Sequence, residues 1–228
     1  MATAITGTTM ELAVGVALWS SLFTAVRFIL FPSRSHDFSN RIVSLVHAFV
    51  ALALCTLSLH DWRHPFQPLA SPASPAQVRA ITVSLAYFIY DFFCCLLEVP
   101  FDAATALHHL VSIMGLCYGF LYKVSGTELV GCLWLMEMSN PCMHAREILK
   151  ELGVKDRPLN LWNDLSFAIT FTIARMGFGP YLTFITLRAN NPLTVKLGAS
   201  GIQIVSVFWF YKIARLIRYK LKKQVKSS

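Results

Sequence analysis

The sequence predicts an all-α membrane protein with about seven transmembrane helices, on the strength of its composition and of its long apolar runs. Of the 228 residues, 55% are hydrophobic and only 14% are charged, and the mean hydropathy is +0.55. Soluble domains carry about 25% charged residues, so this chain has too few charges to cover a surface in water. This excludes a soluble globular protein, a disordered chain and a coiled coil. It also argues against nucleic-acid binding as the reason for the net charge of +8.

Apolar runs of transmembrane length recur along the chain. A helix that spans the bilayer needs about 20 mostly apolar residues. Five runs meet this requirement, at residues 12–30, 42–59, 80–97, 161–187 and 193–213. Two shorter runs that contain ionisable residues, 107–122 and 129–143, either cross the membrane or form re-entrant segments. Gly177-Phe178-Gly179-Pro180 predicts a kink inside the run 161–187, because proline cannot continue an α-helical ladder.

The basic residues indicate how the runs are oriented. They gather after the first run (Arg34, Arg41), after the fifth (Arg146, Lys150, Lys155, Arg157) and from 212 to the C-terminus. Short cytoplasmic loops are enriched in Lys and Arg. These three segments share one side if both short runs cross, and also if neither does. We expect seven crossings, with the N-terminus lumenal or outside and the C-terminus cytosolic. The basic tail then follows from topology, or it attracts anionic lipid.

Cysteines and histidines do not form a recognisable metal motif. The six cysteines lie in apolar runs or at their edges, without a CxxC pair, which is typical of small buried residues between helices. His60 and His64 have helical spacing, but they fall in the proline-rich connection 60–75. The other histidines are scattered along the chain, so we expect no metal site.

Polar residues inside the apolar runs follow helical spacing. A charged side chain at mid-bilayer costs about 2.5–3.5 kcal/mol on insertion scales, so such residues usually pair or face a cavity. Four stripes share a face each: Tyr87, Asp91, Cys94 and Glu98; His108 and Ser112; Glu137, Asn140 and His144; Asp164 and Arg175. Either these stripes line one polar pocket, or they neutralise each other in pairs, for example Arg175 with Glu137 or Asp91.

Two adjacent histidines stand out within these stripes. His108 and His109 are about 100° apart on a helix, so one can face a pocket while the other faces a neighbouring helix. A pocket imidazole can act as a general base or acid near neutral pH, or as a nucleophile towards acyl groups. Asp91 could fix its tautomer.

Several sequence blocks resemble the TLC (TRAM–LAG1–CLN8) domain family. They are Tyr87-Phe88-Ile89-Tyr90-Asp91, His108-His109-Leu110-Val111-Ser112, Gly126-Thr127-Glu128 and Glu137-Met138-Ser139-Asn140-Pro141. The resemblance is closest to the small TLC domain-containing proteins. It implies six helices bundled around an intramembrane cavity, and one extra helix. We therefore divide the chain into a first transmembrane helix and basic loop (1–40), a TLC domain (41–220) and a basic cytosolic tail (221–228).

The resemblance also implies a role in membrane lipid homeostasis, for sphingolipids or phospholipids. In the ceramide synthase branch a histidine pair, which maps onto His108 and His109, is essential for acyl transfer from acyl-CoA. That branch also carries an HD-x-x-D block, whereas this chain has Leu-Trp-Leu-Met-Glu-Met at 133–138. Ceramide synthesis itself is therefore not expected. The family further implies membrane lipids as partners, and the endoplasmic reticulum rather than the plasma membrane as location.

Three functions follow from these residues. The first is acyl transfer to a lipid, with acyl-CoA as a possible co-substrate and no bound cofactor. Its catalytic residues would be His108, His109 and Asp91. The carboxylate partner of His108 would be Asp91 or Glu137. The second is a lipid-binding or regulatory protein that uses the same cavity without chemistry. In both, Glu137, Asn140, Arg175 and Ser112 would contact the ligand. The third is a transporter or receptor, but the sequence shows no inverted repeat.

Overall fold

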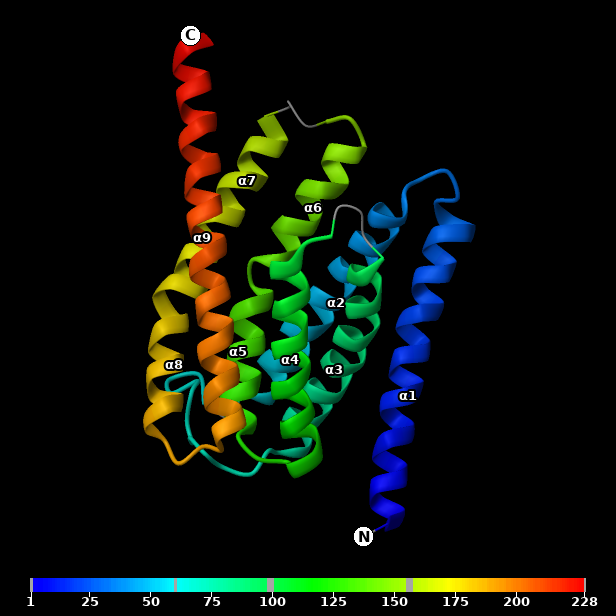
Figure 1. Ribbon diagram of the computed structural model, residues 1–228, viewed down its shortest axis with the longest axis vertical. Coiled ribbons are helices and arrows are strands. Elements are labelled where there is room, and N and C mark those ends of the chain that lie inside the picture. The colour runs from blue at the N-terminus through cyan, green and yellow to red at the C-terminus, as the bar shows by residue number, and fades with distance from the viewer. Residues whose placement is uncertain (1, 60, 98–100, 155–157, 228) are drawn as a thin grey trace.

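The computed structural model describes residues 2–59, 61–97, 101–154 and 158–227, and its regular elements there are helical (Figure 1). The α-helices are α1 (Ala2–Ala25), α2 (His36–Ser58), α3 (Pro75–Leu96), α4 (Ala103–Tyr122), α5 (Gly126–Glu137), α6 (Asn140–Glu151), α7 (Pro158–Phe171), α8 (Gly179–Arg188) and α9 (Leu193–Ser227). Two π-helical segments, η1 (Val26–Leu30) and η2 (Thr172–Phe178), continue α1 and α7.

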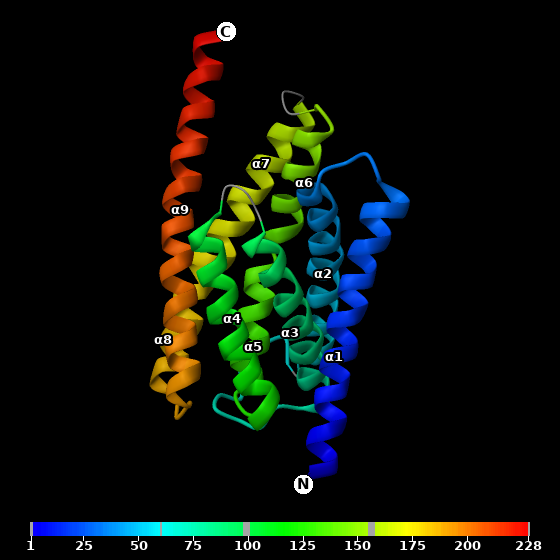
Figure 2. The same ribbon diagram turned by 45° about the vertical axis from the view of Figure 1, so that its right-hand side comes forward.

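Within the described residues these elements form seven columns that run alternately in opposite directions (Figures 1 and 2). α5 and α6 make the fifth column, which is broken at Met138 and Ser139, and α7, η2 and α8 make the sixth. The two chain ends lie at opposite ends of the bundle, as an odd number of columns requires (Figure 1). The predicted fold class, an all-α membrane protein with about seven helices, is confirmed.

Five of the described helices are long and apolar enough to cross a membrane: Thr9–Leu30, His36–Ser58, Pro75–Leu97, Ala103–Tyr122 and Leu193–Arg215. The other two columns consist of shorter pieces. The sixth column is interrupted at η2 and at the start of α8, where the glycines and Pro180 predict a kink. Pro180 has no N–H to donate, so a regular α-helical ladder cannot run through this point.

Short polar residues set where the helices begin. The Ser35 hydroxyl accepts the backbone N–H of Phe38 at the start of α2. Ser74 and Gln77 form a reciprocal capping box before α3, with Pro75 as its first residue. Such caps satisfy backbone donors that have no partner inside the helix.

The first helix packs on the outside of the other six columns. Trp19 of α1 donates its Nε1–H to the carbonyl oxygen of Val83, and its ring meets His47 and Tyr87 edge to face at centroid distances of 5.7 and 5.5 Å. Gly15 allows this approach, because a Cβ there would lie 2.8 Å from Ala86 Cβ. The arrangement therefore matches one extra helix against a bundle of six.

The end of the bundle at which α9 terminates carries Arg34, Arg41, Arg146 and Lys150 and is called the basic end below (upper end in Figure 1). The opposite end is held by a buried polar cluster around Glu128. Its Oε1 accepts from Asn191 Nδ2 at 2.9 Å and from the backbone N–H of Ala70. Asn191 in turn accepts from the Ser125 hydroxyl at 2.7 Å. These contacts join the connections before α3, α5 and α9.

Candidate functional site: a polar cavity above an apolar cavity

A polar cavity of about 350 Å³ lies between the six columns, in the half of the bundle nearer the basic end. Every column except that of α1 contributes to its lining: Asn40 from α2, Asp91 from α3, His108 and His109 from α4, Glu137 and Asn140 from α5 and α6, Arg175 from η2, and Trp209 from α9. Exposed Asp102 and Lys212 also line it, so it reaches the surface at the basic end. Three of the predicted polar stripes thus place residues here: Tyr87 and Asp91 from the first, His108 from the second, and Glu137, Asn140 and His144 from the third.

Both carboxylate oxygens of Asp91 have partners in the polar cavity. Its Oδ1 accepts from Asn40 Nδ2 at 2.8 Å, and its Oδ2 accepts from the Tyr87 hydroxyl at 3.1 Å. His109 Nε2 lies 3.0 Å from the same Oδ2. Tyr90 extends the network, because its hydroxyl donates to Asn40 Oδ1 at 2.8 Å. A buried carboxylate with three donors around it is a fixed acceptor.

The carboxylate partner differs from the expected one. The sequence left Asp91 or Glu137 as the partner of His108, and the structure places the Asp91 carboxylate on His109 instead. The reason is the 100° step between adjacent helical residues, which turns His109 towards α3. The second ring nitrogen of His109, Nδ1, lies 3.5 Å from the Cys95 sulfur.

His108 lies where the polar cavity meets a second cavity. It lines both, as does Phe88. Its ring packs 5.0 Å from the Trp209 ring, between centroids, and its Nδ1 has no hydrogen-bond partner among the described residues. A buried imidazole nitrogen without a partner is available to a ligand or a water molecule.

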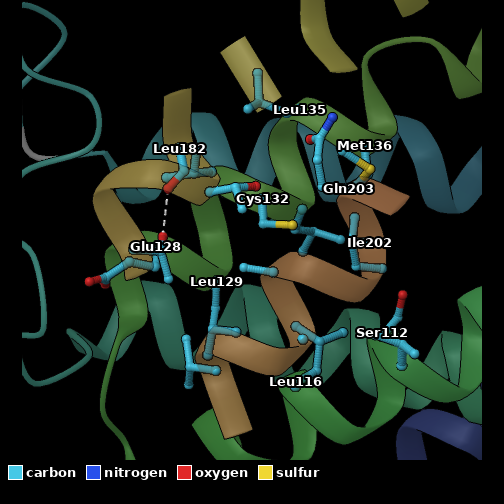
Figure 3. A pocket seen from close by; sticks show the side chains of 18 of the residues that line it. Ser112, Leu116, Glu128, Leu129, Cys132, Leu135, Met136, Leu182, Ile202 and Gln203 are labelled. Carbon is cyan, nitrogen blue, oxygen red and sulfur yellow. Dashed lines mark hydrogen bonds between the residues drawn. The ribbon is translucent and has the colours of Figure 1, made fainter. Parts of the chain in front are cut away.

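The second cavity, of about 70 Å³, is apolar and extends away from the basic end between α4, α5, α8 and α9 (Figure 3). Its lining includes Leu116, Leu129, Met136, Leu182 and Ile202. Ser112 also lines this cavity rather than the polar one. Of the four residues predicted to bind the ligand, Ser112 is thus separated from the other three.

Arg175 is buried, and two of the three nitrogens of its guanidinium have no hydrogen-bond partner among the described residues. Its Nη2 donates to the carbonyl oxygen of Met136 at 2.7 Å and to Asn140 Oδ1 at 2.9 Å. Its Nε and Nη1 have no hydrogen-bond partner among the described residues. The cation also lies over the rings of Phe171 and Trp209, at 4.9 and 5.7 Å from their centroids. Two buried nitrogens, which carry three N–H groups, are therefore left for a ligand oxygen.

Of the remaining predicted polar residues, some line the polar cavity and others form contacts elsewhere in the bundle. Glu137 Oε2 accepts from Asn140 Nδ2 at 2.9 Å, and His144 lines the same cavity. Asp164 instead pairs with Arg146 at 3.2 Å, away from Arg175. The spacing of 11 residues predicted a shared face for Asp164 and Arg175, but Arg175 lies in η2, whose wider turns shift the register. Glu98 lies outside the described residues.

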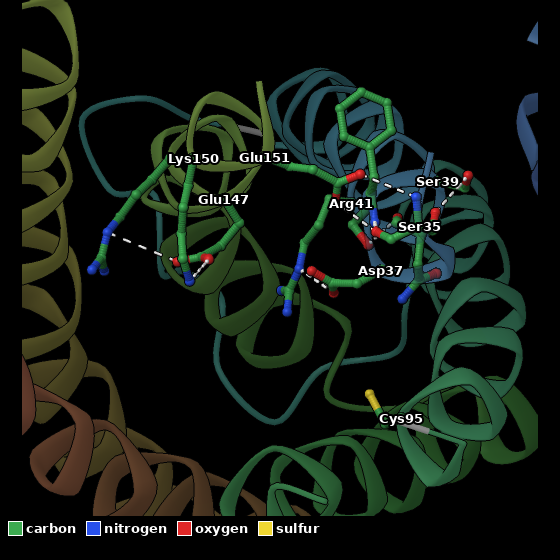
Figure 4. A network of polar contacts seen from close by, with 12 residues as sticks. Ser35, Asp37, Ser39, Arg41, Cys95, Glu147, Lys150 and Glu151 are labelled. Atoms are coloured by element: carbon green, nitrogen blue, oxygen red, sulfur yellow. Dashed lines mark hydrogen bonds and ion pairs between the residues drawn. The ribbon is translucent and has the colours of Figure 1, made fainter. Parts of the chain in front are cut away.

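At the basic end, polar contacts tie α2 to α6 (Figure 4). The backbone N–H and the hydroxyl of Ser35 donate to the Glu151 carboxylate, which ties the start of α2 to the end of α6. Arg41 pairs with Asp37 at 3.0 Å. Figure 4 also shows Cys95 on α3, its sulfur turned towards the interior of the bundle.

Sequence reasoning did not single out Asn40, Cys95 or Trp209 as site residues. Cys95 had been grouped with the other cysteines as a small packing residue. In the structure Asp91, Cys95 and His109 offer ligand atoms within 4.8 Å of one another, as a metal site would. His109 turns a different nitrogen to each of the other two, so in this arrangement the imidazole bridges the carboxylate and the thiol.

Comparison with known proteins agrees with the motifs. The family model described as TLC domain matches residues 37–215. A putative TLC domain-containing protein, L438, of Acanthamoeba polyphaga mimivirus is 22% identical over 147 residues, which cover 62% of this chain and 73% of that protein. TLC domain-containing protein 4-B of Danio rerio is 24% identical over 215 residues, which cover 86% of this chain and 79% of that protein.

Proposed function

Because the chain belongs to the TLC domain family, we propose that it acts in membrane lipid homeostasis by transferring an acyl chain to a lipid acceptor inside the bundle. The supporting observation is that His108 lines both the polar and the apolar cavity. A lipid with its headgroup in the polar cavity and the first part of its chain in the apolar cavity has its headgroup–chain junction next to His108. Acyl transfer takes place at that junction.

The polar cavity offers the groups that such a reaction needs. The unpaired Nε and Nη1 of Arg175 can hold a phosphate, carboxylate or carbonyl oxygen of the bound lipid. His108, with its unpaired Nδ1, is suited to take a proton from the hydroxyl or amine of the acceptor. Asn140 Oδ1 accepts from Arg175, and Glu137 holds Asn140 by accepting from its Nδ2, so the two residues fix the guanidinium in place.

The donor is proposed to be an acyl-CoA or another acyl lipid that reaches the polar cavity from the basic end. Basic side chains gather there, and the cavity reaches the surface between Asp102 and Lys212. We place the protein in the endoplasmic reticulum membrane, with the basic end cytosolic and the N-terminus lumenal. The distribution of Lys and Arg supports this orientation.

The proposal is tested by lipidomics of cells that express the intact protein, His108→Ala, His108→Gln or His64→Ala at equal membrane levels. His64 is an exposed loop residue and serves as the matched control. Acyl transfer predicts that one lipid class changes with the intact protein and with His64→Ala, but with neither His108 variant.

A non-catalytic lipid-binding or regulatory function is the second candidate, favoured by the two unpaired donors of Arg175. Glutamine keeps hydrogen-bonding groups but cannot transfer protons at neutral pH. If His108→Gln shifts the lipid composition as much as the intact protein does, acyl transfer through His108 is wrong and the binding function stands.

A further inference from the structure

The imidazole of His109 bridges a thiol and a carboxylate within the polar cavity. His109 Nε2 lies 3.0 Å from Asp91 Oδ2, and His109 Nδ1 lies 3.5 Å from Cys95 Sγ. A nucleophile within reach of a base, with the base held by a third group, is the arrangement of residues that attack acyl groups. In unliganded proteins the contact between nucleophile and base is often longer than an ideal hydrogen bond.

The hydrogen bonds around Asp91 assign the tautomer of His109. Asp91 already accepts from Asn40 and Tyr87, so it acts as an acceptor towards His109 as well, and the His109 proton lies on Nε2. Nδ1 then presents its lone pair to the Cys95 S–H. This is the protonation state in which a histidine can remove the proton of a thiol.

Position in the cavity distinguishes Cys95 from the neighbouring cysteine. Cys95 lines the polar cavity, whereas Cys94 packs in the apolar core between helices. Both are reduced thiols, since the described residues contain no disulfide. Cys94 is therefore a matched control with the same chemistry, one residue away and directed elsewhere.

We propose that Cys95, His109 and Asp91 form a catalytic triad in which Cys95 carries the acyl chain as a thioester. This inference rests on the proposed acyl transfer and assigns its covalent step. His109 Nδ1 takes the Cys95 proton as the sulfur attacks the carbonyl carbon of an acyl ester or thioester. The S–C bond forms, the bond from that carbon to the alcohol oxygen or coenzyme sulfur breaks, and the leaving group receives the proton from His109.

The second half of the reaction returns the thiol. A hydroxyl or amine of the acceptor lipid attacks the thioester carbonyl and loses its proton to His108. The S–C bond breaks, and the Cys95 thiolate takes up the proton. No oxidant, reductant or further reactant is consumed. Asp91 is a positioning residue here, because it contacts His109 and not the sulfur.

The triad is tested with the full-length protein in nanodiscs. One arm of the experiment supplies alkyne-tagged palmitoyl-CoA, and the other uses nanodiscs that contain alkyne-tagged palmitoyl phosphatidylcholine. Comparison of the two arms shows whether the acyl donor is a thioester or a phospholipid. Intact-protein and peptide mass spectrometry then locate the label, and hydroxylamine tests whether it is a thioester. We expect hydroxylamine-sensitive label on Cys95 in the intact protein and in Cys94→Ala, and none in Cys95→Ala.

Two further variants separate catalysis from packing. His109→Gln is expected to slow labelling by about 100-fold or more, the usual contribution of a general base. Asp91→Asn should slow it too, and labelling of both should recover at alkaline pH, at which a thiol ionises without help. A structural role would not give this dependence on pH. His108→Ala should keep the label and accumulate it, because only the transfer to the acceptor is impaired.

The outcomes separate this inference from the proposed function. If Cys95→Ala forms the lipid product at the rate of the intact protein, the triad is wrong while acyl transfer stands. Product without any label on Cys95 leads to the same conclusion. If the intact protein binds lipid but gives neither label nor product with either donor, both proposals are overturned and the binding function remains.

Discussion

Substitution of Asn40 by alanine gives the most direct test of the network that fixes Asp91. Asn40 donates to Asp91 Oδ1 and accepts from the Tyr90 hydroxyl, both at 2.8 Å. A hydrogen bond to a charged group contributes about 1.5–3 kcal/mol, and one between neutral groups about 0.5–1.5 kcal/mol. Because Asn40 borders the polar cavity, water can replace part of what is lost, so we expect a loss of about 2 kcal/mol in the free energy of unfolding.

The measurement is equilibrium unfolding in mixed micelles of dodecyl maltoside and sodium dodecyl sulfate, followed by tryptophan fluorescence. Asn190→Ala is the control, since Asn190 is exposed and surface substitutions usually change stability by less than about 0.5 kcal/mol. A double-mutant cycle with Tyr90→Phe should show that the two losses are not additive. A loss for Asn40→Ala no larger than that of the control, or strict additivity with Tyr90→Phe, would refute the reasoning.

Two further predictions concern the scaffold and the orientation. Gly126→Ala should destabilise the protein by about 1–3 kcal/mol in the same assay, because the new Cβ would lie 2.7 Å from the backbone Cα of Ala73. Gly177→Ala is the control and should not destabilise it, because the nearest neighbour of its Cβ would lie at 3.9 Å. Equal losses of stability would contradict the close contact at Gly126. A glycosylation acceptor inserted with a spacer into the connection 61–74 should be modified in cells, and one inserted after Gly153 should not. The reverse result would invert the proposed topology.

The seven columns could be predicted because each leaves a signal in the sequence. Apolar runs mark five of them, and the positions of Lys and Arg are consistent with the two weaker runs crossing either both or not at all. The break at Met138 and Ser139 left less of a signal, because α5 and α6 are each only 12 residues long. The π-helical segment η2 had no signal beyond the glycines and Pro180, and it moved Arg175 off the face predicted for Asp164.

The candidate site was predicted only where a residue is costly to bury. Asp91, His108, His109, Glu137 and Arg175 are conspicuous because ionisable groups are rare in apolar helices. Asn40 comes just before the apolar run 42–59, so hydropathy gave no reason to place it in a cavity. Cys95 and Trp209 do not stand out in an apolar helix, and only their positions relative to His109 and His108 distinguish them.

The positions of the buried polar groups also bear on whether they serve only to hold the helices together. Helix packing in a membrane can be achieved with small residues, and this chain does so where Gly15 meets Ala86. Pairwise neutralisation would have joined Arg175 to Glu137 or Asp91, but Arg175 donates to a backbone carbonyl and to Asn140, and keeps two donors unpaired. His108 likewise keeps Nδ1 unpaired. Groups that only joined helices would satisfy each other, so these unpaired atoms, gathered around one cavity, favour a ligand that completes them.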